Sequence, residues 1–395
     1  MKQFNIFRGL ILTILLTCCN AVWAYDIEVD GIYYDITSMT DLTVEVTEGD
    51  NKYSGDIVIP STITYKSRTF TVTSIGTNAF SYSDIKSISI PSSIKTIKDR
   101  SFSSCFGLED VYIDDLVAWC NIDCCTGQNN NLLFYAENFY LKGELITELI
   151  IPEGVVEIKA DKFSYCGQFV SLTIPNSVKS VAGYAFWGCY NLDAVYVDDI
   201  SIWCCIDFDA NCSNPLEYAN KLYANGNLIT NLIVPDGITK MKSYAFSGYQ
   251  SLVSVVIPNS VTNIGNYVFQ NCSALASVVI GDGVTSFGNK VFYECNALEY
   301  IYVMAETPPS VKNDTFTNRN YINTVLYVPT GCLEAYQNAD VWKEFWDIKE
   351  FDTTGISDVK TENKKETTIY DINGRGVENP TNGIYIVDGK KVLLR

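Results

Sequence analysis

The stretch "SVVIPNSVTNIGNYVFQNCSAL" (residues 254–275) joins two local patterns. Its first residues alternate between apolar and small side chains up to Pro258, which is typical of a β-strand that a proline terminates. Its later residues, "YVFQNC", predict a single helical or 3₁₀ turn. The same combination recurs along the chain, and recurrence at a constant spacing indicates a repeat architecture.

The pattern recurs with a period of about 23 residues, which lies in the range typical of solenoid repeats. Pro152 and Pro175 stand one period apart, as do Pro235 and Pro258, and Gly281 follows after one more. The apolar side chains keep the same offsets from this position in each unit. Around Pro258 they are Leu252, Val255, Ile257, Val261, Ile264, Phe269 and Cys272.

One such unit cannot fold alone. Ordering its backbone costs about 1–2 kcal/mol per residue, whereas each buried apolar side chain contributes only about 1.5–3 kcal/mol. Stacked units share a continuous core. The sequence therefore predicts a repeat solenoid of stacked strand, turn and short-helix units over residues 57–351.

Long inserts interrupt the repeats at about residues 114–145 and 198–228. The segments "VYIDDLVAWC" and "VYVDDISIWC" match closely at the start of the two inserts, and their tryptophans, Trp119 and Trp203, stand at the same place in each. A larger repeat of two short units and one long unit has thus been duplicated. We expect one elongated domain.

Both ends of such a stack need a cover. Residues 25–56 contain alternating segments such as "LTVEV" and predict a β-rich N-terminal cap. At the other end the sequence predicts a short aromatic cap helix, whose acidic neighbours oppose a membrane-binding role. The apolar residues of that helix are Leu333, Tyr336, Trp342, Phe345 and Trp346.

The first 24 residues have the features of a signal peptide for export. Lys2 and Arg8 accompany an apolar run, and a small-residue cleavage site ends at Ala24. A lipid anchor at Cys18 or Cys19 is the alternative for this segment. No later stretch is long and apolar enough to predict a membrane span.

The segment "IPNSVTNIGNYVFQNCSAL" closely resembles the BspA-like leucine-rich repeats, and the resemblance covers most of residues 57–351. The strand, "IP", "IG", "AF" and Cys stand in the order typical of that family, with Phe and Cys in place of the Asn ladder of other leucine-rich repeats. The resemblance implies an α/β-type leucine-rich repeat fold. It also implies a cell-surface or secreted bacterial protein whose expected activities are host-protein binding and adhesion.

The composition changes after Phe351. Residues 352–366 are polar and predict a linker, and residues 367–395 predict a β-hairpin tail with a turn at Asp388-Gly389. The tail resembles the C-terminal sorting domains of the type IX secretion system, which implies passage across an outer membrane. A plain terminal hairpin is the alternative.

The composition argues against several classes of function. The 395 residues carry a formal net charge of −18, which opposes binding to nucleic acid or to an anionic membrane surface. The chain contains no histidine, so it lacks the usual general base and the commonest metal ligand. We therefore expect a protein that is not an enzyme and needs no cofactor.

Cysteines recur at one position of the repeat, which Tyr249 occupies in another unit. A position that accepts either Cys or Tyr fills space, so we expect buried thiols and not reactive ones. These cysteines are Cys105, Cys166, Cys189, Cys272 and Cys295. Disulfides from Cys166 to Cys189 and from Cys272 to Cys295 are the alternative, but parallel side chains on stacked units disfavour them.

The cysteines of the inserts follow no such rule. Cys120 and Cys204 come after the matching tryptophans and are expected in the core. Disulfides that pin the inserts stay open, with an undetermined pattern, for Cys124, Cys125, Cys205 and Cys212. A zinc site of Cys120, Cys124 and Cys125 is a weaker alternative, because the spacing is not the paired CxxC form.

Two acidic pairs, Asp114-Asp115 and Asp198-Asp199, stand at matching places after a strand. A turn or helix-cap role explains both pairs without chemistry. Calcium binding and a carboxylate-dependent hydrolase are the alternatives. Catalytic acids would have to converge on one cleft, whereas these pairs are several turns apart.

The remaining candidate is the outer face of the predicted sheet, where every second strand residue points away from the core. Extended faces of this kind are the usual ligand surface of solenoids, and tyrosine is a common interface anchor. The candidate residues are Tyr112, Ile150, Thr173, Tyr196, Ile233, Val256, Val279, Tyr300 and Tyr302. The competing contact site is the set of insert tyrosines Tyr135, Tyr218 and Tyr223. A face that merely suits strand pairing is the third interpretation.

The sequence thus favours an exported, monomeric repeat protein that binds an extracellular or host protein at the cell surface. A carbohydrate-binding module with a glycan partner is the second hypothesis, because tyrosines recur along the face. The third is the hydrolase that depends on the acidic pairs.

Overall fold

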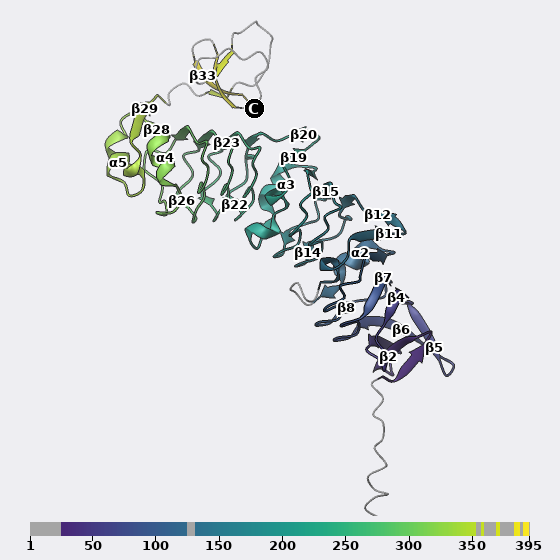
Figure 1. Cartoon of the computed structure of the whole chain (residues 1–395). Helices are drawn as coiled ribbons and strands as arrows, with labels where there is room; N and C mark the ends of the chain where they lie inside the picture. The colour runs from purple at the N-terminus through teal and green to yellow at the C-terminus, as the bar shows by residue number, and fades with distance from the viewer. Residues whose placement is uncertain are drawn as a thin grey trace, which may run out of the picture. The chain divides into compact units, whose positions relative to one another are not determined.

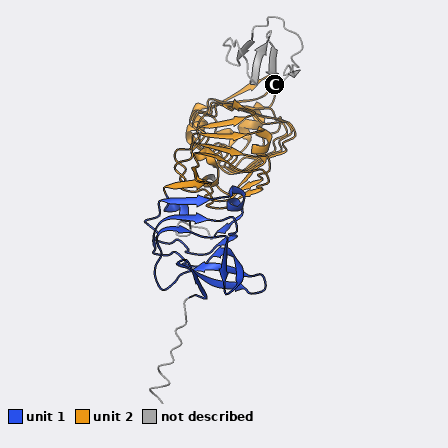
Figure 2. Ribbon diagram, turned by 90° about the vertical axis from the view of Figure 1, so that its right-hand side faces the viewer, with its two compact units in different colours: residues 1–136 blue, residues 137–395 orange. Residues whose placement is uncertain are grey.

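The computed structural model describes residues 25–124 and 131–352 and, beyond them, the backbone of four short strands near the C-terminus. The chain forms two compact units, residues 1–136 and 137–395 (Figure 2), where the sequence suggested one elongated domain. The predicted signal peptide, residues 1–24, lies outside the described part of the chain.

Unit 1 begins with a β-rich cap, as predicted. Its first three strands are antiparallel neighbours, and the third pairs in parallel with the second strand of a following hairpin. These strands are β1 (Ile27–Val29), β2 (Ile32–Ser38), β3 (Thr43–Thr47), β5 (Thr62–Tyr65) and β6 (Arg68–Ile75).

The repeats of unit 1 form two parallel ladders. One contains β4 (Ser54–Val58), β7 (Asp84–Ile90) and β9 (Asp110–Ile113). The other joins β6 to β8 (Thr96–Ile97) and β10 (Asp123–Cys124). The first ladder thus begins inside the segment that the sequence assigned to the cap.

Unit 2 carries two larger parallel sheets, whose strands follow one another side by side in Figure 1. Residues at the same place in consecutive repeats, such as Ser254, Ser277 and Tyr300, are register partners on neighbouring strands. The strands of the first sheet are β13 (Glu148–Ile150), β15 (Ser171–Ile174), β17 (Ala194–Val197), β19 (Lys221–Ala224) and the antiparallel β20 (Asn227–Leu228). Those of the second are β21 (Asn231–Ile233), β23 (Ser254–Ile257), β25 (Ser277–Ile280), β27 (Tyr300–Val303), β28 (Val325–Pro329) and β29 (Asp347–Phe351). The predicted leucine-rich repeat type of solenoid is confirmed.

Short parallel ladders run along the other side of the repeats of unit 2. They contain β14 (Glu157–Ile158), β16 (Ser180–Val181) and β18 (Asp207–Phe208), and β22 (Lys240–Met241), β24 (Asn263–Ile264) and β26 (Ser286–Phe287). The segment "YVFQNC" that follows β24 forms turns and not the predicted helical turn. Tyr267 and Asn271 have φ of 59° and 60°, in the left-handed region, and therefore interrupt any helix there.

Stacked phenylalanines form the core of the repeats. In unit 2 the rings of Phe246, Phe269 and Phe292 lie almost parallel, with centroids 5.7 and 5.5 Å apart. In unit 1, Phe80 and Phe102 stack in the same way at 5.2 Å. Phe163 and Phe186 form a further stack at 5.9 Å, and all these rings are buried, so neighbouring short repeats place their phenylalanines in stacked columns.

The repeated cysteines are buried and free, as expected. The thiols of Cys105, Cys189, Cys272 and Cys295 each donate a hydrogen bond to the carbonyl oxygen of a phenylalanine in the preceding turn. Cys189 Sγ lies 3.2 Å from Phe163 O, and Cys272 Sγ lies 3.2 Å from Phe246 O. These thiols thus donate to backbone carbonyls inside the stack, whereas the sequence had predicted only that they fill space.

Short helices and hairpins fill the inserts. Asp115 caps α2 (Leu116–Asn121) by accepting from the Ala118 amide at 2.9 Å, and Asp199 caps α3 (Ile200–Cys205) by accepting from the Ser201 amide at 2.7 Å. The predicted cap role of these carboxylates is confirmed. The other elements are η2 (Leu132–Phe134), β11 (Asn138–Leu141), β12 (Glu144–Leu145), η3 (Asn211–Ser213) and η4 (Pro215–Glu217).

The C-terminal lid departs from the single aromatic helix that was predicted. It consists of α4 (Asn318–Asn323), α5 (Leu333–Asn338) and η5 (Trp342–Glu344). The chain leaves the helical region at Ala339 and takes a positive φ of 69° at Val341, so Tyr336 lies on α5 and Trp342 on η5, while Phe345 and Trp346 follow η5. Trp342 is fully buried, whereas Trp346 is 76% exposed and covers nothing.

Four strands near the C-terminus form one sheet: β30 (Ser357–Asp358), β31 (Ile369–Asp371), β32 (Gly383–Val387) and β33 (Lys390–Leu394). The antiparallel pair of β32 and β33 has Val387 opposite Lys390, while the predicted turn residues between them lie outside the described residues. β30 stands within the predicted linker. Among the described residues, no helix has the length and apolar composition that a membrane span requires.

Candidate functional site

The outer face of the first sheet of unit 2 presents a row of side chains in register. Ile150, Thr173, Tyr196 and Tyr223 follow one another on neighbouring strands. Ile150 is 61% exposed and Tyr196 is 40% exposed. Tyr196 and Tyr223 stack face to face, with ring centroids 4.9 Å apart and planes 9° from parallel. We call these two residues the tyrosine pair.

The tyrosine pair corrects one prediction. Tyr223 was expected on an insert loop, but it lies on β19 and is the register partner of Tyr196 on β17. The end of the insert returns to the sheet as a strand, which the irregular spacing of the insert concealed. An ion pair between Lys221 and Asp193, at 2.6 Å, lies at the start of the same strand.

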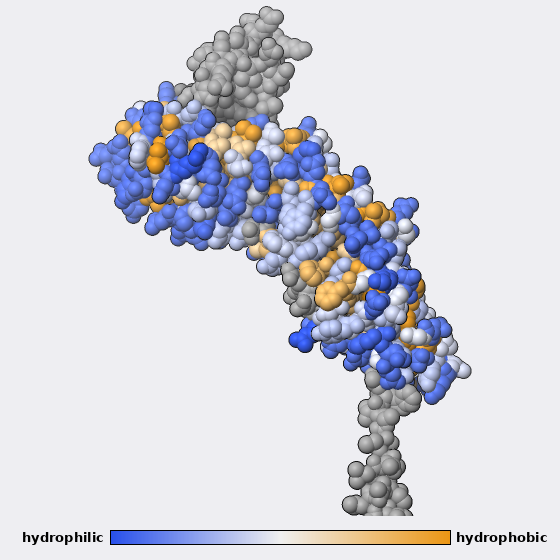
Figure 3. Space-filling view, in the orientation of Figure 1, coloured by the Kyte–Doolittle hydropathy of each residue, from blue (hydrophilic) through white to orange (hydrophobic). Residues whose placement is uncertain are grey.

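The outer face of the second sheet is less exposed. Ile233, Val256 and Val279 form a row of half-buried side chains that continues into Tyr302 and Tyr327. Figure 3 shows hydrophobic patches among hydrophilic surface where β23 lies. This row is therefore a continuous strip of aliphatic and aromatic side chains.

Tyr302 does not have the exposure that was predicted. Its ring stacks on Tyr327 at 4.5 Å, the edge of Phe351 contacts it at 5.5 Å, and only 7% of it remains exposed. Burial raises the pKa of its hydroxyl well above the usual value. Its neighbour Tyr300 is half-buried and keeps part of its ring at the surface.

Unit 1 contributes a separate row of Val58, Ser89 and Tyr112. Tyr112 is half-buried, and its hydroxyl donates to Asp110 Oδ2 at 3.3 Å. The face of unit 1 therefore holds one of the predicted tyrosines in a polar setting.

The other two insert tyrosines hold neighbouring turns in place. The Ser104 amide donates to Tyr135 Oη at 3.0 Å, and the Gly188 amide donates to Tyr218 Oη at 3.0 Å. Both tyrosines are half-buried, and burial raises the pKa of Tyr218 to about 12. Their hydroxyls are thus engaged, and only their ring edges are available to a partner.

Two exposed aromatic residues were missed by the sequence analysis. Phe106 is 83% exposed and packs edge-on against Tyr135 at 5.7 Å, while Tyr190 is 71% exposed and packs edge-on against Tyr218 at 5.5 Å. Both directly follow the repeated cysteine, where other units have Gly, Gln, Ser or Asn. That contrast was the available signal.

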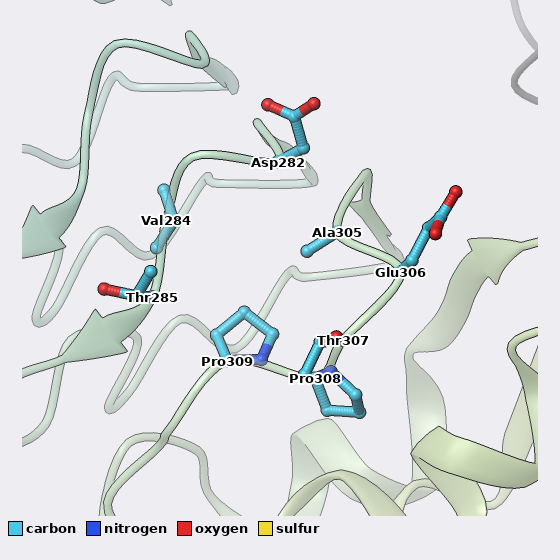
Figure 4. A pocket seen from close by; sticks show the side chains of 8 residues that line it. All are labelled: Asp282, Val284, Thr285, Ala305, Glu306, Thr307, Pro308 and Pro309. Carbon is cyan, nitrogen blue, oxygen red and sulfur yellow. The ribbon is translucent and has the colours of Figure 1, made fainter.

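A shallow pocket of about 340 Å³ lies near the C-terminal end of unit 2. Pro308 and Pro309 form one wall, and Asp282 and Glu306 stand at its rim. Figure 4 shows that the two carboxylates point outward and not toward each other. The described residues contain no group of three potential metal ligands.

A sequence profile of the BspA type leucine rich repeat region matches residues 57–132, 133–204 and 217–339 in six copies, which is more than half of the chain. The chain belongs to the BspA-type leucine-rich repeat family. The family resemblance expected from the sequence is thereby confirmed. A search of curated proteins gave no match.

Solved structures of leucine-rich repeat proteins resemble this chain. A leucine rich cell surface protein from Faecalibacterium prausnitzii is 19% identical, with 82% of this chain and 94% of that chain covered and a TM-score of 0.48. A leucine-rich repeat protein from Bacteroides ovatus is 21% identical, with 83% and 100% covered and a TM-score of 0.41. The pneumococcal vaccine antigen PcpA is 16% identical, with 82% and 98% covered and a TM-score of 0.36.

Proposed function

We propose that this member of the BspA-type family is exported to the cell surface and binds an extracellular or host protein in an adhesive role. The observation that carries the proposal is the tyrosine pair, two stacked aromatic rings at the surface of a regular parallel sheet. Aromatic side chains held rigidly in register supply contact area at low entropic cost. The partner therefore contacts the outer face of the first sheet of unit 2.

The test is a binding screen of the full chain against extracellular-matrix and mucosal proteins. For a partner found in this way, Tyr196→Ser and Tyr223→Ser should each weaken binding by at least ~10-fold, because interface anchors are worth about 2 kcal/mol or more. Tyr184→Ser is the control, since Tyr184 is 52% exposed, more than Tyr196, but lies on a turn. Full binding by both pair variants would contradict this site.

The insert tyrosines are the competing contact site. Tyr135→Ser and Tyr218→Ser remove the rings, whereas Tyr135→Phe and Tyr218→Phe remove only the hydroxyl that accepts from the neighbouring turn. If binding survives the pair variants and the phenylalanine variants but is lost in the two serine variants, the contact site lies on the inserts.

Glycan binding is a second candidate, because Phe106 and Tyr190 present aromatic rings to solvent. Sugars stack on exposed aromatic faces, and the two residues occur in equivalent places of the duplicated repeat. A glycan array with Phe106→Ser and Tyr190→Ser as comparisons tests it. A silent array with the wild-type chain would exclude the glycans presented.

We also propose that the C-terminal strands serve as a sorting domain for export across an outer membrane. The support is the sequence resemblance of residues 367–395 together with the strand pairing of β31, β32 and β33. Fusing this tail to a periplasmic reporter in a cell with the type IX system should bring the reporter to the surface. Retention in the periplasm would contradict the proposal.

A further inference from the structure

Strand β4 has a free edge. It stands at the end of its sheet and pairs only with β7 among the described strands. The Ile59 amide donates to Ser89 O on the β7 side at 3.1 Å. Because successive strand residues direct their backbone groups to opposite sides, the N–H and C=O groups of Val58 and Asp56 face away from β7. These groups form an open hydrogen-bonding edge.

This edge opens into a groove of about 320 Å³. The β1–β2 segment Val29–Ile32 and Tyr34 line one side, and Asp56–Val58 with Pro60 line the other. Strand β1 is itself the outermost strand of its sheet. The groove, which we call the edge groove, thus lies between two strands that, within the described part of the chain, each have one side without a paired strand.

The floor of the edge groove holds an unsatisfied polar group and its rim holds an exposed aliphatic side chain, while Asp56 at the rim accepts a hydrogen bond from Ser87 Oγ at 2.8 Å. Tyr34 is fully buried, and its hydroxyl has no hydrogen-bond partner. Val58 is 67% exposed, although it is an aliphatic residue in a strand. An edge with an exposed β-branched residue and an open backbone is the feature that natural proteins usually protect against pairing. The bulge at Gly55/Asp56 disrupts the ladder before Asp56 but leaves Asp56–Val58 regular.

The negative charges at the rim of the groove favour a basic incoming strand. Asp30 and Asp56 both line the groove, on a chain with a formal net charge of −18. Pairing of two copies through this edge would bring like charges together, which is unfavourable across strands. An incoming strand with a lysine or arginine would instead place a cation beside the two carboxylates.

We propose that the edge groove binds an extended segment of a partner protein as an added strand on β4, with apolar side chains on one face toward Tyr34 and Ile57 and basic side chains on the opposite face toward Asp30 and Asp56. Backbone pairing gives such a site its affinity, and the alternate side chains give it its selectivity. This site lies in unit 1, apart from the tyrosine pair, and goes beyond the proposed function.

The probe is a fluorescein-labelled peptide that alternates valine with lysine or threonine, titrated into the full chain and followed by fluorescence anisotropy. Two matched peptides carry N-methyl groups on alternate amides, one peptide for each edge of the strand. A third has glutamate in place of lysine. We expect saturable binding of the first peptide, and at least ~10-fold weaker binding of one N-methylated peptide and of the glutamate peptide.

Variants of the protein locate the site. Val58→Pro removes the outward amide and should abolish binding, whereas Val58→Thr keeps it and should bind normally. Asp56→Lys should weaken binding of the lysine peptide by at least ~10-fold and improve binding of the glutamate peptide. Asp282→Lys is the control for a charge change elsewhere, and thermal melts monitor folding. Asp56→Lys keeps the test decisive if Val58→Pro does not fold.

Equal binding of all four peptides, or unchanged binding by Asp56→Lys, would overturn the proposal. So would a concentration-dependent dimer that Val58→Pro dissociates, because the occupant would then be a second copy of the chain. Tyr196→Ser and Tyr223→Ser should leave peptide binding unchanged. That result distinguishes a failure of the edge groove proposal from a failure of the proposed site at the tyrosine pair.

Discussion

The repeated cysteines act as hydrogen-bond donors in the core of the stack. Burial raises the pKa of Cys105 to about 11 and that of Cys189 to about 12, because the thiolate is poorly solvated there. Such thiols carry almost no thiolate at neutral pH and are therefore poor nucleophiles. Cys205, in contrast, is exposed on the second insert.

Replacing one of these thiols should weaken the stack. Cys272→Ala removes the thiol donor to the Phe246 carbonyl, which keeps its bond from the Tyr249 amide at 3.1 Å, and opens a small cavity, so we expect a loss of about 1–2 kcal/mol in the free energy of unfolding. Urea unfolding measures this difference. Cys205→Ala is the control and should change stability by less than about 0.5 kcal/mol. Equal losses for both variants would contradict a donor role.

Glu217 is a partly buried carboxylate whose Oε2 has no hydrogen-bond partner. Burial raises its pKa above the ordinary value of 4.5, so the folded state favours the protonated form. The resulting stability is complete below that ordinary pKa and is lost as the pH rises through the raised one. The unpaired charge therefore destabilises the fold at neutral pH.

Glu217→Gln should accordingly raise the melting temperature near pH 7, with a gain of roughly 1 kcal/mol. The gain should shrink near pH 4, where the wild-type carboxyl is largely protonated. Thermal melts at both pH values provide the measurement, and Glu153→Gln, at an exposed acidic residue, is the control. A gain that does not depend on pH would rule out the charge as its cause.

At the scale of elements, each insert begins with a short capped helix that positions a buried tryptophan. Trp203 follows the Asp199 cap, and its Nε1 donates to Ala245 O at 2.7 Å. The cap therefore links the start of the insert to the next unit of the repeat.

Asp199→Ala should cost about 1 kcal/mol of unfolding free energy, the usual loss for a helix cap. Asp198→Ala is the matched control, because Asp198 is also exposed and acidic but does not cap α3. Chemical denaturation of the two variants distinguishes them. If they are equally destabilised, the cap has no special role and local charge accounts for the effect.

At the scale of the whole molecule, the last turns of unit 2 depend on the C-terminal lid. Trp342 packs against Phe287 and Phe316, with ring centroids 6.1 and 5.9 Å apart, and its Nε1 donates to Pro309 O at 2.9 Å. The lid thus continues the phenylalanine column of the repeats and closes it.

Trp342→Ala should destabilise unit 2 by about 3–5 kcal/mol, because it removes a large, fully buried side chain. Trp346→Ala, at the exposed tryptophan that follows it, should have little effect. Differential scanning calorimetry and binding of a hydrophobic dye report the loss and the opening of the end. A similar small effect for both tryptophans would show that the stack needs no lid.

Much of this fold could be predicted, because every unit of a repeat protein has the same pattern of buried positions. Val255, Ile257, Phe269 and Cys272 are all buried, as the spacing indicated, since each turn must bury the same positions against its neighbours. The cap role of Asp115 and Asp199 was also accessible, because a helix cap is a local interaction. The helical turn at Tyr267 was predicted wrongly, because a residue with a left-handed backbone conformation does not alter the spacing of the hydrophobic residues.

The exposure of the candidate site was less accessible to prediction. Tyr302 looked like its neighbours on the outer face, yet Tyr327 and Phe351 from the end of the chain bury it. Tyr223 looked like a loop residue, yet strand pairing places it beside Tyr196. The stacking of turns was encoded locally, because every unit repeats the same buried positions. Which tyrosines reach solvent depended on contacts between segments far apart in sequence, and those exist only once the chain has folded.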